Sequence, residues 1–309
     1  MKIVYMGTPD FAVPTLESLV KGGHDVIAAV TQPDKPKGRG KAVLMTPVKE
    51  KALEYGIPVY QPVKARDPEF VELLKGMVPD AIVVVAFGQL LPKEILEIPK
   101  YGCVNVHASL LPKYRGAAPI QWAVIDGEEK SGVTTMLMDE GLDTGDMLEK
   151  VEYVLDPKET GGSLFDKLST MGGDLILSTL EKLENGTITR TPQGETTTSY
   201  AKMLKKSMGE IDWSMEAVKI ERLIRGLNPW PSAYSTLKGK TVKIWAAEVV
   251  EGETTGNPGR VTVTKDKLLV ETGKDILSVT ELQVEGKKRM DIAAFLRGFS
   301  VEDQSIFGA

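Results

Sequence analysis

The first 140 residues alternate between short apolar runs and segments of helical spacing. Continuous apolar runs are typical of buried strands, and apolar residues three or four positions apart are typical of helices. The sequence predicts strands at residues 2–7, 25–31, 57–61, 81–87, 102–109 and 133–138. It predicts helices at 13–20, 46–55, 67–77 and 118–125. This order of elements favours an α/β fold with a doubly wound, mostly parallel sheet.

The pattern changes after a long amphipathic segment at residues 163–183. Residues 185–200 are polar and rich in threonine and glycine, which is typical of a linker. A helix is expected at 215–225, followed by short strands at 233–237, 242–249, 259–264, 268–271 and 276–284. Five short strands separated by turn residues indicate a small β-barrel, for which an OB-like fold is one candidate. We therefore predict one domain at 1–188, a linker at 189–208 and a C-terminal β-barrel domain at 209–309.

The strand predicted at residues 102–109 carries a row of polar side chains. Asn105, His107 and Ser109 occupy alternate positions and would share one face of the strand. In open α/β sheets, ligands bind beyond the carboxyl ends of the strands. An amide donor beside a histidine suits acyl transfer through an oxyanion. Polar residues that only satisfy one another at a strand end would give the same pattern.

Residues 32–41 form a basic segment in which Lys35, Lys37, Arg39 and Lys41 alternate with proline and glycine. Nothing in this segment can pack a core, so the sequence predicts a mobile surface loop. Two interpretations stay open from the residues alone. The loop is either only solvated, or it is an arm that contacts phosphate groups.

The segment at residues 139–146 is rich in aspartate and glycine and contains Asp139, Asp143 and Asp146. These aspartates either form local turns or include a carboxylate that orients His107 from a neighbouring strand end. The spacing lacks the ligand pattern of a calcium-binding EF-hand. The chain has two histidines and one cysteine without metal-ligand spacing, so no metal site is predicted.

Charge and composition narrow the class of protein further. Residues 200–309 hold 17 Lys and Arg against 15 Asp and Glu, whereas the other residues hold 21 against 28. The second part is therefore the better candidate for an anionic partner. No apolar run approaches the ~20 residues of a membrane span. The single cysteine and a start that runs straight into a predicted strand, without a signal segment, lead us to expect a cytoplasmic protein.

Five segments together resemble the methionyl-tRNA formyltransferase family. They are MGTPDFA (6–12), QPDKPKGRGK (32–41), VNVHASLLPKYRGAAPIQW (104–122), MDEGLDTGDML (138–148) and NPWP (228–231). They follow the family's order and spacing and span both predicted domains. The resemblance implies transfer of a formyl group from 10-formyltetrahydrofolate to the amino group of methionine on initiator tRNA.

The resemblance also implies roles for individual residues. The catalytic Asn, His and Asp of the family fall on Asn105, His107 and Asp143. Its folate-binding segment falls on Ser109, Leu110, Leu111 and Pro112. Its mobile basic loop, which approaches the tRNA acceptor end, falls on Lys35, Lys37, Arg39 and Lys41. Its C-terminal barrel helps to hold the tRNA, and no metal is implied.

Two rival functions remain open from the sequence. The first is a formyltransferase acting on a small amine, such as glycinamide ribonucleotide or an amino sugar nucleotide, which would not need the basic loop or the second domain. The second is a nucleic-acid-binding protein that has lost catalysis, which would not need Asn105, His107 and Asp143 together.

Overall fold

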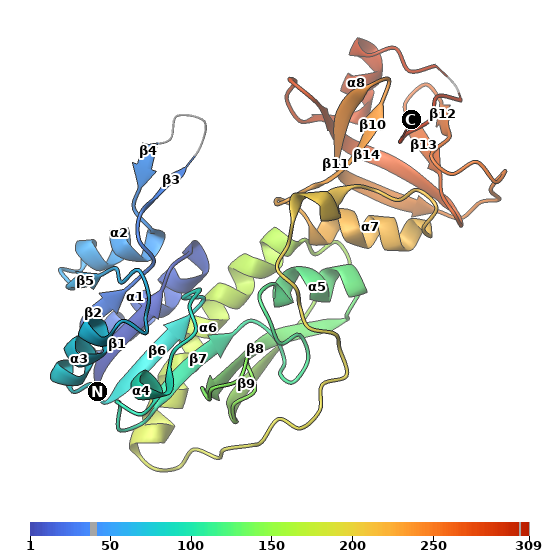
Figure 1. The fold of residues 1–309 in the computed structure, drawn as a ribbon. Coiled ribbons are helices and arrows are strands. Elements are labelled where there is room, and N and C mark those ends of the chain that lie inside the picture. The colour runs from blue at the N-terminus through green and yellow to red at the C-terminus, as the bar shows by residue number, and fades with distance from the viewer. Residues whose placement is uncertain (38–41, 303, 309) are drawn as a thin grey trace. The chain divides into compact units, whose positions relative to one another are not determined.

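The computed structural model describes residues 1–37, 42–302 and 304–308. The chain divides into two compact units (Figure 1). The first unit comprises Met1–Pro119, Lys130–Val154 and Phe165–Ala201, and the second comprises Ile120–Glu129, Leu155–Leu164 and Lys202–Ala309. The second unit thus takes in two short segments from the middle of the chain.

The first unit is built on a seven-stranded sheet with the order β5-β2-β1-β6-β7-β8-β9. The strands are β1 (Lys2–Gly7), β2 (Asp25–Val30), β5 (Val59–Tyr60), β6 (Ala81–Val85), β7 (Cys103–His107), β8 (Lys130–Leu137) and β9 (Met147–Val154). Neighbours from β5 to β7 pair in parallel, whereas the β7–β8 and β8–β9 pairs are antiparallel. This arrangement confirms the predicted mostly parallel α/β sheet.

Helices cover the apolar faces of this sheet. They are η1 (Asp10–Ala12), α1 (Val13–Lys21), α2 (Pro47–Glu54), α3 (Pro68–Met77), α4 (Lys93–Leu96) and α6 (Gly161–Glu184). All five residues of β6 are buried, as expected for a strand with both faces covered. Thr46 caps α2 by accepting a hydrogen bond from the Lys49 amide at 3.2 Å, with Pro47 as the first helical residue.

Helix α6 packs against one face of β7 and leaves the other for the polar side chains. A Cβ atom added at Gly172 would lie 2.8 Å from Cγ1 of Val106, so only glycine lets the helix approach so closely. Val106 alternates with Asn105 and His107, which therefore project from the opposite face of the strand.

Cys103, the first residue of β7, is 1% exposed. Its thiol donates a weak hydrogen bond to the Ile95 carbonyl at 3.8 Å. Burial raises the pKa of this thiol to about 12. Cys103 is therefore a packing residue that stays protonated at neutral pH.

The second unit is an antiparallel sheet with helices packed on it. Its strand order is β10-β11-β14-β13-β12, and β15 pairs with β14. The elements are η2 (Lys206–Gly209), α7 (Ala217–Gly226), β10 (Ala233–Leu237), β11 (Lys240–Val250), β12 (Val261–Val263), β13 (Leu268–Glu271), β14 (Ile276–Val284), β15 (Met290–Asp291) and α8 (Ile292–Gly298). The five predicted strands and the predicted helix are present, and the sequence missed β15 and α8. Helix α5 (Pro119–Asp126) also lies largely in this unit.

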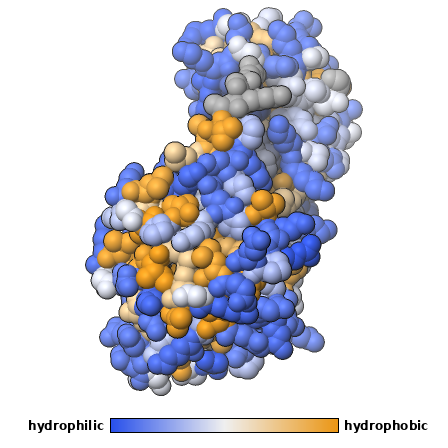
Figure 2. Space-filling model, turned by 60° about the vertical axis from the view of Figure 1, so that its left-hand side comes forward, coloured by the Kyte–Doolittle hydropathy of each residue, from blue (hydrophilic) through white to orange (hydrophobic). Residues whose placement is uncertain are grey.

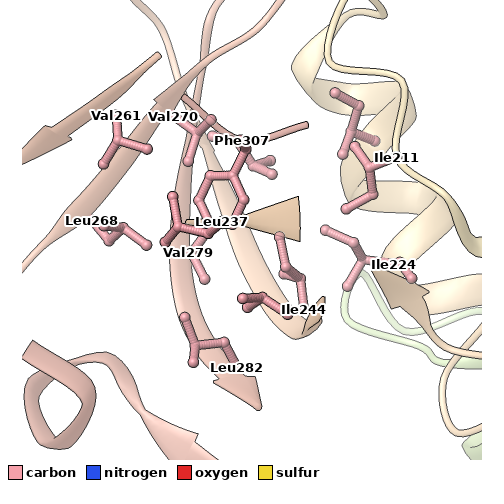
Figure 3. Packing of buried hydrophobic residues seen from close by; sticks show 14 of the residues in the cluster. Ile211, Ile224, Leu237, Ile244, Val261, Leu268, Val270, Val279, Leu282 and Phe307 are labelled. Carbon is pink, nitrogen blue, oxygen red and sulfur yellow. The ribbon is translucent and has the colours of Figure 1, made fainter. Parts of the chain in front are cut away.

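One apolar core holds the second unit together. Figure 3 shows Leu237, Ile244 and Val279 pointing toward one another, with Phe307 beside them. Phe307 lies in the C-terminal segment, which forms hydrogen bonds at both edges of the sheet, beside β12 and on β10. The Phe307 amide donates to the Gly259 carbonyl next to β12, and the Gly308 amide donates to Thr236 of β10, both at 2.8 Å.

The basic segment differs from the predicted loop. Its flanks form an antiparallel hairpin of β3 (Lys35–Lys37) and β4 (Ala42–Leu44), with Lys35 opposite Leu44. Backbone hydrogen bonds between two short strands need no apolar core, which explains why the residue pattern did not indicate them. Val43, Leu44 and Met45 are 65%, 49% and 48% exposed. Figure 2 shows apolar residues exposed on the surface of the molecule, among polar ones.

Candidate active site

Strand β7 positions the two polar side chains on which the site is built. Asn105 lies opposite Val84 of β6 and Met136 of β8, and His107 lies opposite Thr134 of β8. Because β7 lies between these two strands, its backbone is fixed from both sides. Asn105 and His107 are 9% and 6% exposed, so both are polar residues in a largely buried setting.

The imidazole ring of His107 is held in a defined orientation. Its Nε2 atom lies 3.0 Å from the Tyr114 carbonyl oxygen. A carbonyl only accepts hydrogen bonds, so Nε2 must carry a hydrogen and donate it. The other ring nitrogen, Nδ1, lies 3.9 Å from Oδ1 of Asp143. Nδ1 is therefore the ring atom that can gain or lose a proton while Nε2 keeps its partner.

Asp143 is held so that its two carboxylate oxygens have different surroundings. The Gly116 amide donates to Oδ2 at 2.9 Å, which leaves Oδ1 facing His107. Asp143 has a left-handed backbone with φ of 55°, a conformation that aspartate tolerates better than most residues. Asp139 behaves differently, because it accepts hydrogen bonds from Gly141 and Thr144 within the loop. Asp139 thus fits the interpretation of a local turn, whereas Asp143 lies beside His107.

The side-chain amide of Asn105 has no hydrogen-bond partner among residues 1–37, 42–302 and 304–308. Within the same residues, the fully enclosed side-chain atoms without a partner are Thr15 Oγ1 and Trp245 Nε1, so the Asn105 amide is not sealed from the surface and is available to a ligand. The Asn105 amide and His107 Nδ1 are the two polar groups of this strand face that protein partners leave accessible for chemistry.

The segment after β7 is a tight turn fastened to the sheet. The predicted strand continued two residues too far: β7 ends at His107, and the Ser109 amide donates to the His107 carbonyl at 2.9 Å. Ser109 therefore does not continue the strand face. Thr134 donates to the Ser109 carbonyl at 2.7 Å and accepts from the Leu111 amide at 3.1 Å. One hydroxyl on β8 thus fixes the chain on both sides of Leu110.

The four side chains predicted to bind folate fall into two groups. Ser109 and Leu111 are each 1% exposed. The Ser109 hydroxyl donates to the Lys113 carbonyl, and Leu111 packs against Met136 and Met147. Leu110 and Pro112 are only partly buried. The first pair thus holds the turn, and the second pair retains surface for a ligand.

The sequence missed the part that residues 191–201 take in this site. The Gln193 side chain donates to the Asp143 and Gly145 carbonyls at 2.8 and 2.7 Å. It also accepts from Nε of Arg115 at 2.9 Å. A polar stretch rich in threonine is typical of a linker, and no residue pattern signalled these contacts. The Tyr114 carbonyl and the Gly116 amide were missed too, because backbone groups have no sequence signature.

The predicted tRNA-contacting cations are described only in part. Lys35 is exposed at the start of β3, and Lys37 is described by its backbone alone. Arg39 and Lys41 lie outside the described residues. Their predicted role therefore stays a prediction.

Two findings concern metals and membranes. In the described part of the chain, no group of three or more His, Cys, Asp or Glu side chains is arranged to hold a metal ion. Within the same residues, no helix combines the length and apolar character that crossing a membrane requires.

Comparison with known proteins defines the class first. Residues 1–180 match the formyl transferase family and residues 203–300 match the formyl transferase C-terminal domain, so the chain is a formyl transferase. Among solved structures, a Helicobacter canadensis N-formyltransferase, in complex with folinic acid and dTDP-3-aminofucose, is similar with a TM-score of 0.67. It is 20% identical, over 90% of this chain and 99% of that chain. HypX from Aquifex aeolicus in complex with tetrahydrofolic acid has a TM-score of 0.61 at 19% identity, over 99% of this chain and 50% of that chain.

Curated relatives are more similar and more specific. The methionyl-tRNA formyltransferase of Agathobacter rectalis is 57% identical over 99% of both chains. That of Clostridioides difficile is 52% identical over the full length of both. The chain therefore belongs to the methionyl-tRNA formyltransferase family.

Proposed function

We propose that the polar face of β7 and the Asp143 loop form the catalytic centre of this enzyme. The enzyme transfers a formyl group from 10-formyltetrahydrofolate to the α-amino group of methionine on initiator methionyl-tRNA. One observation carries the proposal. His107 Nδ1 faces the Asp143 carboxylate, which the Gly116 amide holds in place. The strand that carries His107 also presents the unpaired Asn105 amide.

The nucleophile sets the tasks of the site. A free α-amino group has a pKa of about 7.7–8.0, and esterification to tRNA lowers it, so much of the amine is neutral at physiological pH. The enzyme therefore needs little help to deprotonate the amine before attack. The harder tasks are to stabilise the oxyanion that forms on the formyl oxygen and to move a proton as the folate nitrogen leaves.

Each of the three side chains suits one of these tasks. The Asn105 amide donates a hydrogen bond to the oxyanion. His107 as imidazolium donates from Nδ1, since Nε2 is occupied by the Tyr114 carbonyl, and Nδ1 can also transfer a proton. Asp143 Oδ1, at 3.9 Å, stabilises the positive charge on that ring.

We propose that the turn Ser109–Leu110–Leu111–Pro112 contacts the folate. Its partly buried Leu110 and Pro112 can pack against a planar ring system, while Ser109 and Leu111 keep the turn in shape. The unpaired Asn105 amide lies two residues before the end of β7. It can bind a carbonyl group that the ligand carries beside such a ring system.

We further propose that the basic hairpin and the second unit hold the tRNA, with Lys35, Lys37, Arg39 and Lys41 contacting the acceptor end. In the second unit, Lys238 and Arg289 pair with Glu302 and Glu281. Several other lysines of this unit pair with no carboxylate within the described ranges, and they include Lys240, Lys243, Lys287 and Lys288. These four are the better candidates for phosphate contacts.

The domain boundaries remain part of the proposal: a catalytic domain at 1–188, a linker at 189–208 and a tRNA-binding domain at 209–309. The hydrogen bonds of residues 191–201 hold this part of the proposed linker against the catalytic unit. For the second unit we propose a small barrel of OB type. The bonds from Phe307 and Gly308 to opposite sides of the sheet support closure of that barrel.

The test is formyl transfer from 10-formyltetrahydrofolate to methionylated initiator tRNA, with methionylated elongator tRNA and an amino sugar nucleotide as competing acceptors. We expect transfer to initiator tRNA, and a much lower kcat for Asp143→Asn with tRNA binding unchanged. Wild-type turnover in Asp143→Asn would refute the proposed catalytic centre. Preferred transfer to the amino sugar nucleotide would favour the small-amine alternative.

A further inference from the structure

We propose that Gln193 is a positioning residue for catalysis, which fixes Asp143 relative to His107 by joining the Asp143 loop to residues 114–116. This inference rests on the proposed role of Asp143. Gln193 lies in the polar stretch that the sequence indicated as a linker, and no residue pattern assigns it a role.

The Gln193 amide makes three hydrogen bonds to the segments around the proposed catalytic pair. Its Nε2 donates to the Asp143 and Gly145 carbonyls, and its Oε1 accepts from Arg115. The carbonyls can only accept and the guanidinium can only donate, so these partners fix which end of the amide points each way. Gln193 is 9% exposed, which shields its hydrogen bonds from water.

The segments that Gln193 joins are those that orient the catalytic pair. Arg115 stands between Tyr114, whose carbonyl binds His107, and Gly116, whose amide binds Asp143. On the other side, Gln193 binds the backbone of Asp143 itself. One side chain thus sets the spacing between the peptide that supports His107 and the loop that carries its carboxylate.

The Asp143 loop needs such support because it is exposed and conformationally demanding. Gly141, Leu142 and Thr144 are exposed, with Leu142 at 52%. Asp143 itself has φ of 55°. The two hydrogen bonds from Gln193 hold the backbone of this loop, and the Gly116 amide holds the Asp143 carboxylate.

The segment that carries Gln193 is anchored independently of this side chain. Thr191 exchanges two backbone hydrogen bonds with Met147, both at 2.9 Å. At the other end, Ala201 donates to the Arg115 carbonyl and accepts from the Ala117 amide, both at 2.8 Å. Removing the Gln193 amide should therefore loosen the Asp143 loop without releasing residues 191–201.

The experiment compares Gln193→Met and Gln193→Glu with the wild-type enzyme in formyl transfer to initiator methionyl-tRNA. Methionine keeps the volume but removes the amide, and glutamate keeps an acceptor for Arg115 but loses both donors. Each variant should lower kcat by roughly 10- to 100-fold, the scale expected for a misplaced catalytic group. KM for both substrates should change by less than about twofold, because the Gln193 amide is buried and bonded to protein groups.

A matched control separates positioning from general loss of buried hydrogen bonds. Thr179 is fully buried in α6 and bonds to Thr135 at 2.8 Å and to Glu149 at 2.8 Å. Thr179→Val should lower the melting temperature but leave kcat unchanged. An equal loss of kcat in Thr179→Val would overturn the positioning role.

The variant Asp143→Asn shows whether Gln193 acts through Asp143. In the double variant with Gln193→Met, the second change should have almost no further effect on kcat, since two residues that act as a unit are not additive. A full additional loss would overturn the inference. The inference would also be overturned if Gln193→Met kept the wild-type kcat while Asp143→Asn was strongly impaired. That result would leave the proposed catalytic centre intact. Wild-type kcat in Asp143→Asn would refute that centre instead.

Discussion

Replacing Gly116 by alanine should damage both stability and turnover. Gly116 has φ of 125°, a conformation that side chains rarely adopt. An added Cβ would lie 2.7 Å from the Ala201 carbonyl oxygen and 2.8 Å from the Tyr200 ring. The same residue donates its amide to Asp143. The substitution therefore strains the backbone at the point that orients the proposed catalytic carboxylate.

The size of the effect follows from these contacts. A non-glycine residue in such a backbone region costs about 1–3 kcal/mol. Relieving the contact also requires Ala201 to move, and Ala201 is bonded to Arg115 and Ala117. Each hydrogen bond lost adds about 0.5–1.5 kcal/mol. If both hydrogen bonds are lost, we expect the free energy of unfolding to fall by about 2–6 kcal/mol. We expect kcat to fall by roughly 100-fold if the amide moves about 1 Å from Asp143.

The assay pairs urea unfolding with single-turnover formyl transfer, and Gly186→Ala is the matched control. Gly186 has φ of 69°, and nothing lies within 4 Å of its added Cβ. This control should lose about 1–2 kcal/mol from backbone strain alone and keep its turnover. The reasoning would be refuted if Gly116→Ala lost no more stability than the control and kept the wild-type kcat.

Three further predictions follow from the site and its surroundings. Asn105→Ala and His107→Ala should each lower kcat by about 10²–10³ with tRNA affinity unchanged in a binding assay, and near-normal turnover in His107→Ala would contradict its assignment. Arg39→Ala should lower kcat/KM for tRNA while folate binding stays normal in a titration, and an equal effect from Lys35→Ala would indicate diffuse charge rather than a specific contact. Partial burial acts to raise the pKa of Glu149, but hydrogen bonds from neighbouring side chains outweigh it and hold that pKa below its ordinary 4.5. The stabilising effect of the ionised Glu149 is therefore present above pH 4.5 and lost as pH falls through the lowered pKa. Glu149→Gln should make stability fall less steeply with decreasing pH in this range. An unchanged pH dependence would contradict the prediction.

Local patterns predicted the elements that bury apolar residues. β6 is a continuous apolar run, and β7 alternates apolar and polar residues, so both strands and the shared face of Asn105 and His107 could be read from the sequence. β9 was missed because its residues from Glu149 onward alternate between partly buried and exposed, as on an edge strand, and do not form a continuous apolar run like that of β6.

The candidate site could be predicted only where side chains carry the chemistry. Asn105, His107 and Asp143 stood out by residue type and by resemblance to a family. The Tyr114 carbonyl and the Gly116 amide could not, since every residue except proline offers the same backbone groups. Gln193 could not either, because its contacts join parts of the chain about 50 and 78 residues away, and spacing along the sequence carries no record of them.

The burial of Cys103 makes this enzyme a natural background for site-specific labelling. The only thiol of the chain is shielded by the sheet and stays protonated, so maleimides and similar reagents have no native target in the folded protein. A cysteine introduced at the exposed Val43 on β4 would be the sole reactive thiol. A fluorophore attached there would test whether tRNA reaches the hairpin, without any prior removal of native cysteines.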